Sequence, residues 1–388
     1  MSMENRTVGE CFHQIRNGAN IKQGLANGGF PITRLDTTAN DTFNRDRMGY
    51  AGITDIGRYE GFILEDGDLL MSHINSVQYL GRTVLYKKQP GEVIIHGMNL
   101  LGLKANRNII LPEYARYCFY APGFREQLTK ITKKSVNQAS FTVSDLKKIV
   151  IKVPSLNEQR RTVVILDKTK ELLGYRRDEL QKLDELIKAR FVEMFGDPLS
   201  VTKDKKKLSD IGRIYTGNTP SMKNPEYYDS EDIPFVKPGD IAESGVSLIK
   251  QVDSFISEKA RNVARIIPQD AVLVTCIGTI GKIGIATEEC CCNQQINYIV
   301  PDADVDSVYL AYCISFFKDV LADMANAPVV PIINKTQFSA LEIPVAECGK
   351  QIQFSRFVQQ VDKSKAVVQK ALDEAHILFD SLMQQYFG

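Results

Sequence analysis

The chain has 388 residues, more than one ordinary hydrophobic core accommodates, and its length favours two or three domains. Hydrophobic residues make up 44% and charged residues 24% of the chain, a balance that excludes a largely disordered protein. The formal net charge of +1 neither requires nor excludes a nucleic-acid partner. The apolar runs are too short to span a bilayer, and "MSMENRTVGECFHQIRNG" lacks the apolar core of a signal peptide. We therefore expect a cytoplasmic protein with no membrane partner.

Residues 1–154 combine strand-like and helix-like segments. Short apolar or alternating runs such as "GFILEDGDLLMSH" and "RTVLYKK" are separated by glycine and proline, which is typical of strands joined by turns. The segment "PEYARYCFYAPGFREQLTKIT" then has helical spacing. We predict an α+β globular unit over residues 1–154.

A long helix is predicted over residues 155–196. Ser155 can cap its first turn and Glu158 can reach back, as in a capping box. Apolar residues then recur every seven positions, the spacing of a coiled-coil seam. These residues are Leu166, Leu173, Leu180, Ile187 and Met194.

The same plan follows a second time. Polar, lysine-rich residues 197–207 read as a linker, and residues 208–346 hold strand-like runs such as "DAVLVTCIG" and "QINYIVP" before a helical segment. A second long helix is predicted over residues 347–388, with one interruption of its stripe at Lys365. The apolar residues proposed for its partner or coiled-coil face are Val361, Val368, Leu372, Phe379 and Leu382.

An internal repeat relates the two halves of the chain. "DLKKIVIKVPSLNEQ" matches "QFSALEIPVAECGKQ", and the separation between them also relates Phe195-Gly196 to Phe387-Gly388. We therefore predict an α+β fold with a pseudo-twofold internal repeat. Two β-rich recognition units are each followed by a long helix, and the two helices pair as an antiparallel coiled coil.

Motifs for catalysis or metal binding are weak. The eight cysteines include no C-x2-C pair, and the four histidines are scattered, so no metal site is expected. "KNPEYY" departs from the motif of amino-methyltransferases, and "GTIGKIG" lacks the GK[ST] ending of a phosphate loop. We predict a binding protein without catalytic residues or a cofactor of its own.

Four loops carry side chains that can read DNA: "TGNTPSMKNP", "NQQIN", "SHINSVQ" and "KKSVNQASF". Asn and Gln can bond adenine, and Lys, Ser and Thr can bond phosphates, although ordinary turns also favour Asn, Ser and Pro. Two such surfaces indicate a two-part DNA target. The candidate DNA contacts in the first half are Ser72, His73, Asn75, Gln78, Lys133, Lys134 and Asn137.

The sequence resembles the specificity subunits of type I restriction-modification systems. "TGNTPSMKNPEYY", "VLVTCIGTIGKIGIA" and "CCNQQINYIVP" are similar to their target recognition domain, and "VPSLNEQRRTVVILDK" and "MFGDP" are similar to the start and close of their conserved spacer helix. The resemblance covers essentially the whole chain. It implies that the second half contacts DNA through Thr219, Ser221, Lys223, Asn224, Thr279, Lys282, Gln294 and Gln295.

The resemblance also implies a set of partners. Such a chain is a non-catalytic subunit that reads a split sequence in double-stranded DNA and docks two methyltransferase subunits on its paired helices. S-adenosylmethionine would be bound by those partners, and a separate restriction subunit would supply the motor and nuclease.

Two other classes compete with this hypothesis. One is an assembly protein whose coiled coil carries β-rich heads that bind protein or glycan. The other is a fused methyltransferase that both reads and modifies DNA, against which the missing cofactor motifs argue.

Overall fold

The computed structural model describes residues 4–24, 29–136, 138–201, 205–325 and 330–388. The chain divides into two compact units, one comprising Met1–Tyr175 with Ala371–Gly388 and the other Arg176–Lys370. Among the described residues, no helix is both long and apolar enough to cross a membrane.

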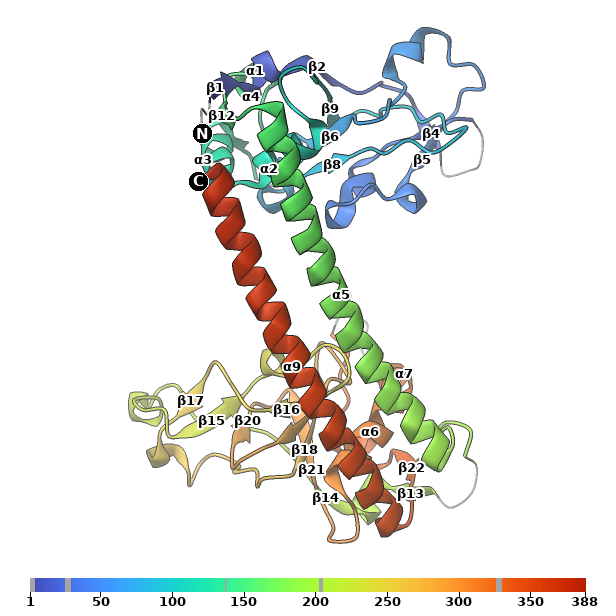
Figure 1. The fold of residues 1–388 in the computed structure, drawn as a ribbon. Coiled ribbons are helices and arrows are strands. Elements are labelled where there is room, and N and C mark those ends of the chain that lie inside the picture. The colour runs from blue at the N-terminus through green and yellow to red at the C-terminus, as the bar shows by residue number, and fades with distance from the viewer. Residues whose placement is uncertain (1–3, 25–28, 137, 202–204, 326–329) are drawn as a thin grey trace. The chain divides into compact units, whose positions relative to one another are not determined.

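The first unit is built on a four-stranded antiparallel sheet with strand order β2-β9-β6-β8 (Figure 1). Small sheets flank it, in the orders β3-β5-β4 and β10-β11-β7, and β1 pairs with β12. The strands are β1 (Glu4–Thr7), β2 (Phe12–Asn17), β3 (Gln23–Gly24), β4 (Pro31–Ile32), β5 (Gly49–Ala51), β6 (Leu69–Ser72), β7 (Ile74–Asn75), β8 (Thr83–Leu85), β9 (Leu100–Ala105), β10 (Lys133–Lys134), β11 (Ala139–Ser140) and β12 (Val150–Val153). The short helices are α1 (Val8–Cys11), α2 (Pro112–Tyr120), α3 (Pro122–Ile131) and α4 (Val143–Leu146).

The core of the first unit includes both long helices. α5 (Leu156–Phe195) contributes Leu166, and α9 (Cys348–Phe387) contributes Phe387, to a cluster with the apolar face of the sheet and α2. The rings of Tyr114 and Phe387 lie 5.1 Å apart between centroids. The start of α5 and the end of α9 therefore complete one hydrophobic core, as an antiparallel pair requires.

The second unit repeats this plan around a five-stranded sheet with order β14-β21-β18-β19-β16. Its neighbouring strands are antiparallel except β16 and β19, which are parallel. A three-stranded sheet, β17-β15-β20, and the pair β13-β22 complete the unit. The strands are β13 (Lys205–Lys207), β14 (Gly212–Thr216), β15 (Ile233–Val236), β16 (Val246–Ile249), β17 (Phe255–Ile256), β18 (Val272–Thr275), β19 (Ile283–Ala286), β20 (Cys291–Cys292), β21 (Ile296–Pro301) and β22 (Glu342–Pro344). The helices are α6 (Ser307–Phe316), α7 (Lys318–Met324) and α8 (Lys335–Ser339).

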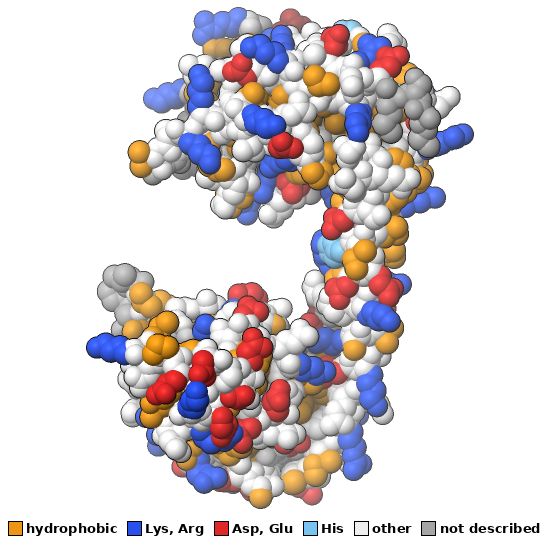
Figure 2. Space-filling model, turned by 90° about the vertical axis from the view of Figure 1, so that its left-hand side faces the viewer, with side chains coloured by type: hydrophobic (Ala, Val, Ile, Leu, Met, Phe, Trp, Pro, Cys, Tyr) orange, Lys and Arg blue, Asp and Glu red, His pale blue; other side chains and the backbone are white. Residues whose placement is uncertain are grey.

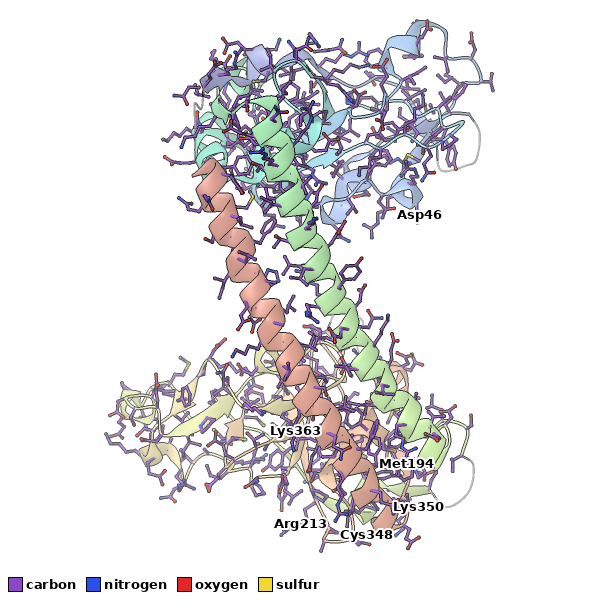
Figure 3. All side chains as sticks on the ribbon, viewed as in Figure 1. Asp46, Met194, Arg213, Cys348, Lys350 and Lys363 are labelled. Atoms are coloured by element: carbon purple, nitrogen blue, oxygen red, sulfur yellow. The ribbon has the colours of Figure 1, made fainter. Side chains whose placement is uncertain are left out.

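The predicted long helices and their antiparallel pairing are confirmed. Within the second unit, Phe191 of α5 contacts Phe354 of α9, and Asp184 of α5 binds Lys365 of α9 at 2.6 Å. From the first contact to the second, the residue number rises along α9 and falls along α5. The two segments therefore run in opposite directions. Figure 3 labels Met194 near the end of α5 and Cys348 at the start of α9.

The predicted seam residues lie on the inner faces of these helices to different degrees. Six are buried: Leu166, Leu173, Ile187, Val361, Val368 and Leu372. Four are half-buried: Leu180, Met194, Phe379 and Leu382. Lys365, which interrupts the stripe, has its ammonium neutralised by Asp184, so a charge pair replaces an apolar contact there. The predicted capping box at the start of α5 also forms, because Ser155 N donates to Glu158 Oε2 and Glu158 N donates to Ser155 Oγ.

An equivalent glutamine anchors the start of each long helix. Gln159 and Gln351 are fully buried. The Gln351 amide donates to the carbonyls of Ala346 (2.7 Å) and Asp304 (3.3 Å) and accepts from Asp306 N (2.8 Å). Gln159 donates to Ile109 and Pro154 and accepts from Leu111 N, each at 2.8 Å. Each side chain thus ties its helix to the loop that precedes α2 or α6.

Replacing Gln351 by methionine is expected to lower the free energy of unfolding of the second unit by about 2–4 kcal/mol. Methionine fills the same space but removes the partner of two backbone carbonyls and one backbone amide in partly buried surroundings, and each lost hydrogen bond costs about 0.5–1.5 kcal/mol. Chemical denaturation of both proteins measures the difference. Gln360→Met, at an exposed position of the same helix, is the control, and an equal effect of the two changes would contradict the anchoring role.

Candidate nucleic-acid interface

Three loops of the second unit meet at one end of its five-stranded sheet. β14 ends at Thr216, which pairs with Asn297 near the start of β21, and β18 ends at Thr275, which pairs with Ile296. The loop after β14, the turn from β18 to β19 and the turn before β21 therefore share one edge. We call residues 217–224, 276–281 and 293–295 the second-unit edge.

Hydrogen bonds join these loops directly. Thr219 Oγ1 donates to Gln294 Oε1 at 2.8 Å, and Cys276 N donates to the Gln295 carbonyl at 2.7 Å. The Asn293 amide donates to Gln295 Oε1 at 2.8 Å. Thr219 and Gln294 are exposed and Gln295 is half-buried, so the edge presents hydroxyl and amide groups to solvent on a connected frame.

The other predicted residues of this half divide between surface and interior. Ser221, Lys223, Asn224 and Thr279 are exposed on the loops of the second-unit edge. Lys282 is only 6% exposed, and its ammonium donates to the Pro238 carbonyl at 3.0 Å and pairs with Glu243 at 2.6 Å. Because its charge is already neutralised, Lys282 holds the turn in place and does not reach outward in this structure.

The two candidate loops of the first unit are joined by a small sheet. β7, which carries Asn75, pairs with β11, and β11 pairs with β10, formed by Lys133 and Lys134. Gln78, Lys133 and Lys134 are exposed and Asn75 is half-buried. Residues 72–78 and 133–134 thus form one surface at the end of β6, which we call the first-unit edge.

Two predicted residues of the first unit are interior. Ser72 is fully buried at the end of β6, and His73 is 7% exposed. Burial lowers the pKa of His73, and its ring packs against that of Phe141, with 6.3 Å between the centroids. A neutral, buried imidazole offers no charge to a phosphate. Asn137 lies outside the described residues.

Sequence reasoning missed two residues that brace the recognition loop of the second unit. Asn218 Nδ2 donates to the Val263 carbonyl, and Arg265 N donates to Asn218 Oδ1, both at 2.8 Å. The Arg265 guanidinium also donates to the Thr216 carbonyl. Arg265 is exposed and lies beside the loop, where a cation favours contact with DNA phosphates. The loop containing Arg265 carries no sequence signal of its own, because its pairing with Asn218 is long-range.

The buried cysteines of the second unit are unreactive. Burial raises the pKa of Cys276, Cys290 and Cys291 to about 12, so these thiols stay protonated and are poor nucleophiles. No group of three or more His, Cys, Asp or Glu side chains suited to a metal ion occurs within the described part of the chain.

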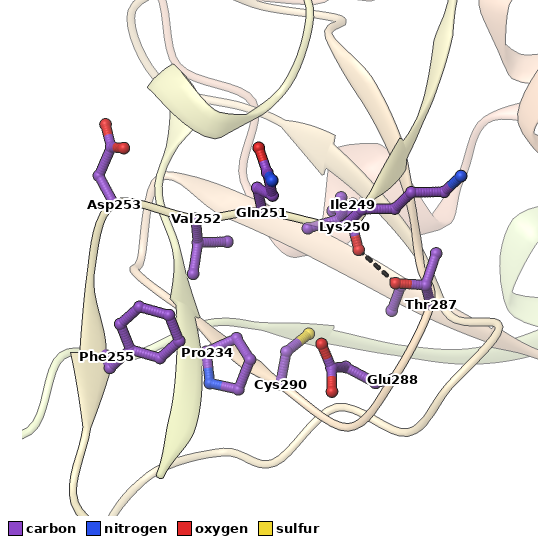
Figure 4. Close-up of a pocket in the computed structure, with 11 residues that line it drawn as sticks. Pro234, Ile249, Lys250, Gln251, Val252, Asp253, Phe255, Thr287, Glu288 and Cys290 are labelled. Carbon is purple, nitrogen blue, oxygen red and sulfur yellow. Dashed lines mark hydrogen bonds between the residues drawn. The ribbon is translucent and has the colours of Figure 1, made fainter. Parts of the chain in front are cut away.

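A pocket of about 350 Å³ lies at the opposite end of the five-stranded sheet from the second-unit edge (Figure 4). Ile249, Phe255 and Cys290 line it together with the charged Lys250 and Glu288. The Thr287 hydroxyl on its wall already donates to the Ile249 carbonyl. We assign no chemistry to this pocket.

Acidic side chains gather on one face of the second unit. Figure 2 shows that Asp and Glu side chains gather on its visible face, the side that carries β15, β17 and β20 in Figure 1. Such a face repels the phosphate backbone of DNA. DNA is therefore expected to approach the second unit from another side.

A protein-family model decides the identity of the chain. The model for the type I restriction modification DNA specificity domain matches twice, over residues 2–184 and 200–375. The chain belongs to this family. The two matches agree with the two repeated units, and the proteins of this family named below are specificity subunits, which are DNA-recognition components rather than enzymes.

Comparisons with individual proteins agree with this assignment. The chain is 26% identical to a type I restriction enzyme specificity subunit of Methanocaldococcus jannaschii, MjaX, over 95% of the chain and 90% of that protein. A solved S subunit of a type I restriction-modification system from M. genitalium has a TM-score of 0.60 and 13% identity, with 100% of this chain and 96% of that chain covered. A chain from a study of complex assembly in the type I R-M system has a TM-score of 0.56 and 16% identity, with 99% and 97% covered. The specificity fold therefore extends over the whole chain.

Proposed function

We propose that this chain is the DNA-specificity subunit of a type I restriction-modification complex and reads a two-part target. The observation that carries the proposal is that both units have a polar edge, the first-unit edge and the second-unit edge. Each unit of a chain from the specificity family gathers amide, hydroxyl and ammonium groups at the corresponding end of its main sheet. Two edges of different sequence would each select one half-site.

The other members of the complex follow from the same proposal. The chain would bind double-stranded DNA and two methyltransferase subunits, with restriction subunits added for cleavage, and would act in the cytoplasm. S-adenosylmethionine would be held by the methyltransferase subunits. In support, the glycine-rich turn at Gly278–Gly284 joins two strands, β18 and β19, and does not lead into the helix that a phosphate-binding loop requires.

The experiment that tests this function is co-expression of the chain with a type I methyltransferase subunit, followed by mapping of adenine methylation across the host DNA. We expect methylation at one split sequence with a fixed gap. An assembled, soluble complex that methylates no defined sequence would favour a coiled-coil assembly protein with β-rich heads. Binding of labelled S-adenosylmethionine by the purified chain alone would overturn the assignment of the cofactor to the partner.

The long helices offer a surface on which the methyltransferase subunits can dock. In the first unit, Ile165, Leu172 and Tyr175 lie on one face of α5, and Ile377 and Leu378 lie on α9, all exposed. Exposed apolar residues at helical spacing are typical of a face that another helix covers. We propose that one methyltransferase subunit contacts this face.

Changing Ile165 and Leu172 together to glutamate is expected to abolish co-purification of the methyltransferase subunit. Both side chains are about 40% exposed, so the charges meet water in the free chain but would be desolvated in the complex. The double variant Ile165→Leu with Leu172→Met keeps the face apolar and is the control. Retained co-purification by a folded glutamate variant would exclude this face.

A further inference from the structure

The registers of the two main sheets define which residues of the first unit correspond to the second-unit edge. In the first unit, Ser72 at the end of β6 pairs with Leu100 at the start of β9. In the second unit, Thr275 at the end of β18 pairs with Ile296 at the start of β21. Because β6 and β18 occupy the same place in the two folds, Leu100 corresponds to Ile296.

A second strand pair gives the same alignment independently. Asn17 at the end of β2 pairs with Leu101, and Thr216 at the end of β14 pairs with Asn297. Leu101 directly follows Leu100, and Asn297 directly follows Ile296, so both strand pairs give the same alignment. The end of β2 therefore corresponds to the end of β14, although the two sequences differ.

A close backbone approach occurs at the same place in both units. A Cβ atom on Gly18, the residue after β2, would lie 2.1 Å from the carbonyl oxygen of Gly97. A Cβ atom on Gly217, the residue after β14, would lie 2.3 Å from the carbonyl oxygen of Asn293. Only glycine permits such contact. In each unit, the loop after the first long strand is thus pressed against the turn before the central strand.

This correspondence places two asparagines where the second unit has the polar residues Thr219 and Gln295. When residues are counted back from Leu100 and Ile296, Asn99 aligns with Gln295 and Met98 aligns with Gln294. Counting from the matched glycines, Asn20 takes the place of Thr219. Asn20 and Asn99 are exposed. They belong to loops that the sequence analysis did not consider.

The turn that carries Asn99 has a strained and supported backbone. Asn99 has a φ of 78°, in the left-handed region that costs energy for most residues and that asparagine tolerates. Met98 N donates to the Ala19 carbonyl at 3.0 Å, which joins the turn to the Asn20 loop. This hydrogen bond holds the backbone of the Asn99 turn beside the Asn20 loop.

We propose that the first unit reads its half of the DNA target through the side-chain amides of Asn20 and Asn99, each selecting an A·T pair. An asparagine side chain pairs bidentately with adenine, because its NH2 group donates to N7 and its oxygen accepts from the N6 amino group. The inference rests on the proposed function, since it names the bases read by the first unit.

Methylation maps of assembled complexes test this inference. Asn99→Gly keeps the left-handed backbone and removes only the amide, and Asn20→Ala removes the other amide. Each change is expected to reduce discrimination at one A·T pair of one half-site by roughly tenfold or more, and to leave the other half-site unchanged. Asn99→Asp, which also tolerates this backbone, is expected to weaken selection of adenine and favour cytosine at that position, because a carboxylate only accepts hydrogen bonds.

Two controls separate the possible outcomes. Gln294→Ala, in the second-unit edge, should relax the other half-site and so assign each half-site to a unit. Asn108→Ala lies beyond the opposite end of β9 and should change neither half-site. Two outcomes would overturn the inference and leave the proposed function intact, provided that the wild-type complex has a defined target. In the first, the changes at Asn20 and Asn99 leave the target unaltered. In the second, they alter the same half-site that Gln294→Ala affects. A wild-type complex without a defined target would overturn both.

Discussion

Replacing Phe191 by alanine is expected to lower the free energy of unfolding of the second unit by about 3–5 kcal/mol. Phe191 is fully buried near the end of α5. Its ring centroid lies 5.2 Å from those of Phe316 and Phe354 and 5.4 Å from that of Tyr309. Loss of this ring removes contacts with the sheet-covering helix α6 and with α9 together, and a cavity remains because three elements would have to move to close it.

The measurement is denaturant-induced unfolding of the full chain followed by a probe in the second unit. Val192→Ala removes apolar atoms from the next residue of α5, whose side chain is 40% exposed, and is expected to cost less than about 1 kcal/mol. Similar losses for the two variants would show that the aromatic cluster does not fasten α5 to the second unit.

Replacing Gly217 by alanine is expected to reduce specific DNA binding by the assembled complex roughly a hundredfold. The added Cβ atom would lie 2.3 Å from the Asn293 carbonyl oxygen and 2.4 Å from both the carbonyl oxygen and the Sγ atom of Cys292. The loop must therefore move away from the turn, which breaks the hydrogen bond between Thr219 and Gln294. Several base contacts would lose their geometry at once, at about 1–3 kcal/mol for each good contact.

Competition binding with target and unrelated duplexes at one fixed salt concentration measures this loss, because salt alters both affinities. Gly349→Ala is a matched control, since a Cβ atom there approaches another atom only at 3.9 Å. Unchanged preference for the target in a folded Gly217→Ala complex would show that the second-unit edge does not read bases.

Much of the fold could be predicted because its signals are local. The capping box at Ser155 and Glu158 requires residues only three positions apart, and the heptad stripe follows from the helical period. The sequence repeat aligns Gln159 with Gln351, but the buried hydrogen bonds of these two side chains could not be predicted from the sequence. Their shared environment explains why the two helix starts carry the same residue.

The candidate site was harder to predict because its geometry depends on long-range pairing. The resemblance implied a DNA contact at Lys282, but this side chain folds inward to Glu243 and the Pro238 carbonyl. The residues of the edges otherwise stay predictions as DNA contacts. Neither Asn20 nor Asn99 belongs to a motif, and only the strand registers relate them to the second-unit edge.

The interleaving of the two units sets an order for synthesis. The core of the first unit includes Met383 and Phe387 from the last turns of α9, while most of that unit is made before residue 176. On the ribosome, the first unit therefore lacks Phe387, which packs against Tyr114, until the whole second unit has been translated. The unfinished apolar core is a place where chaperones can bind before the last turns of α9 are made.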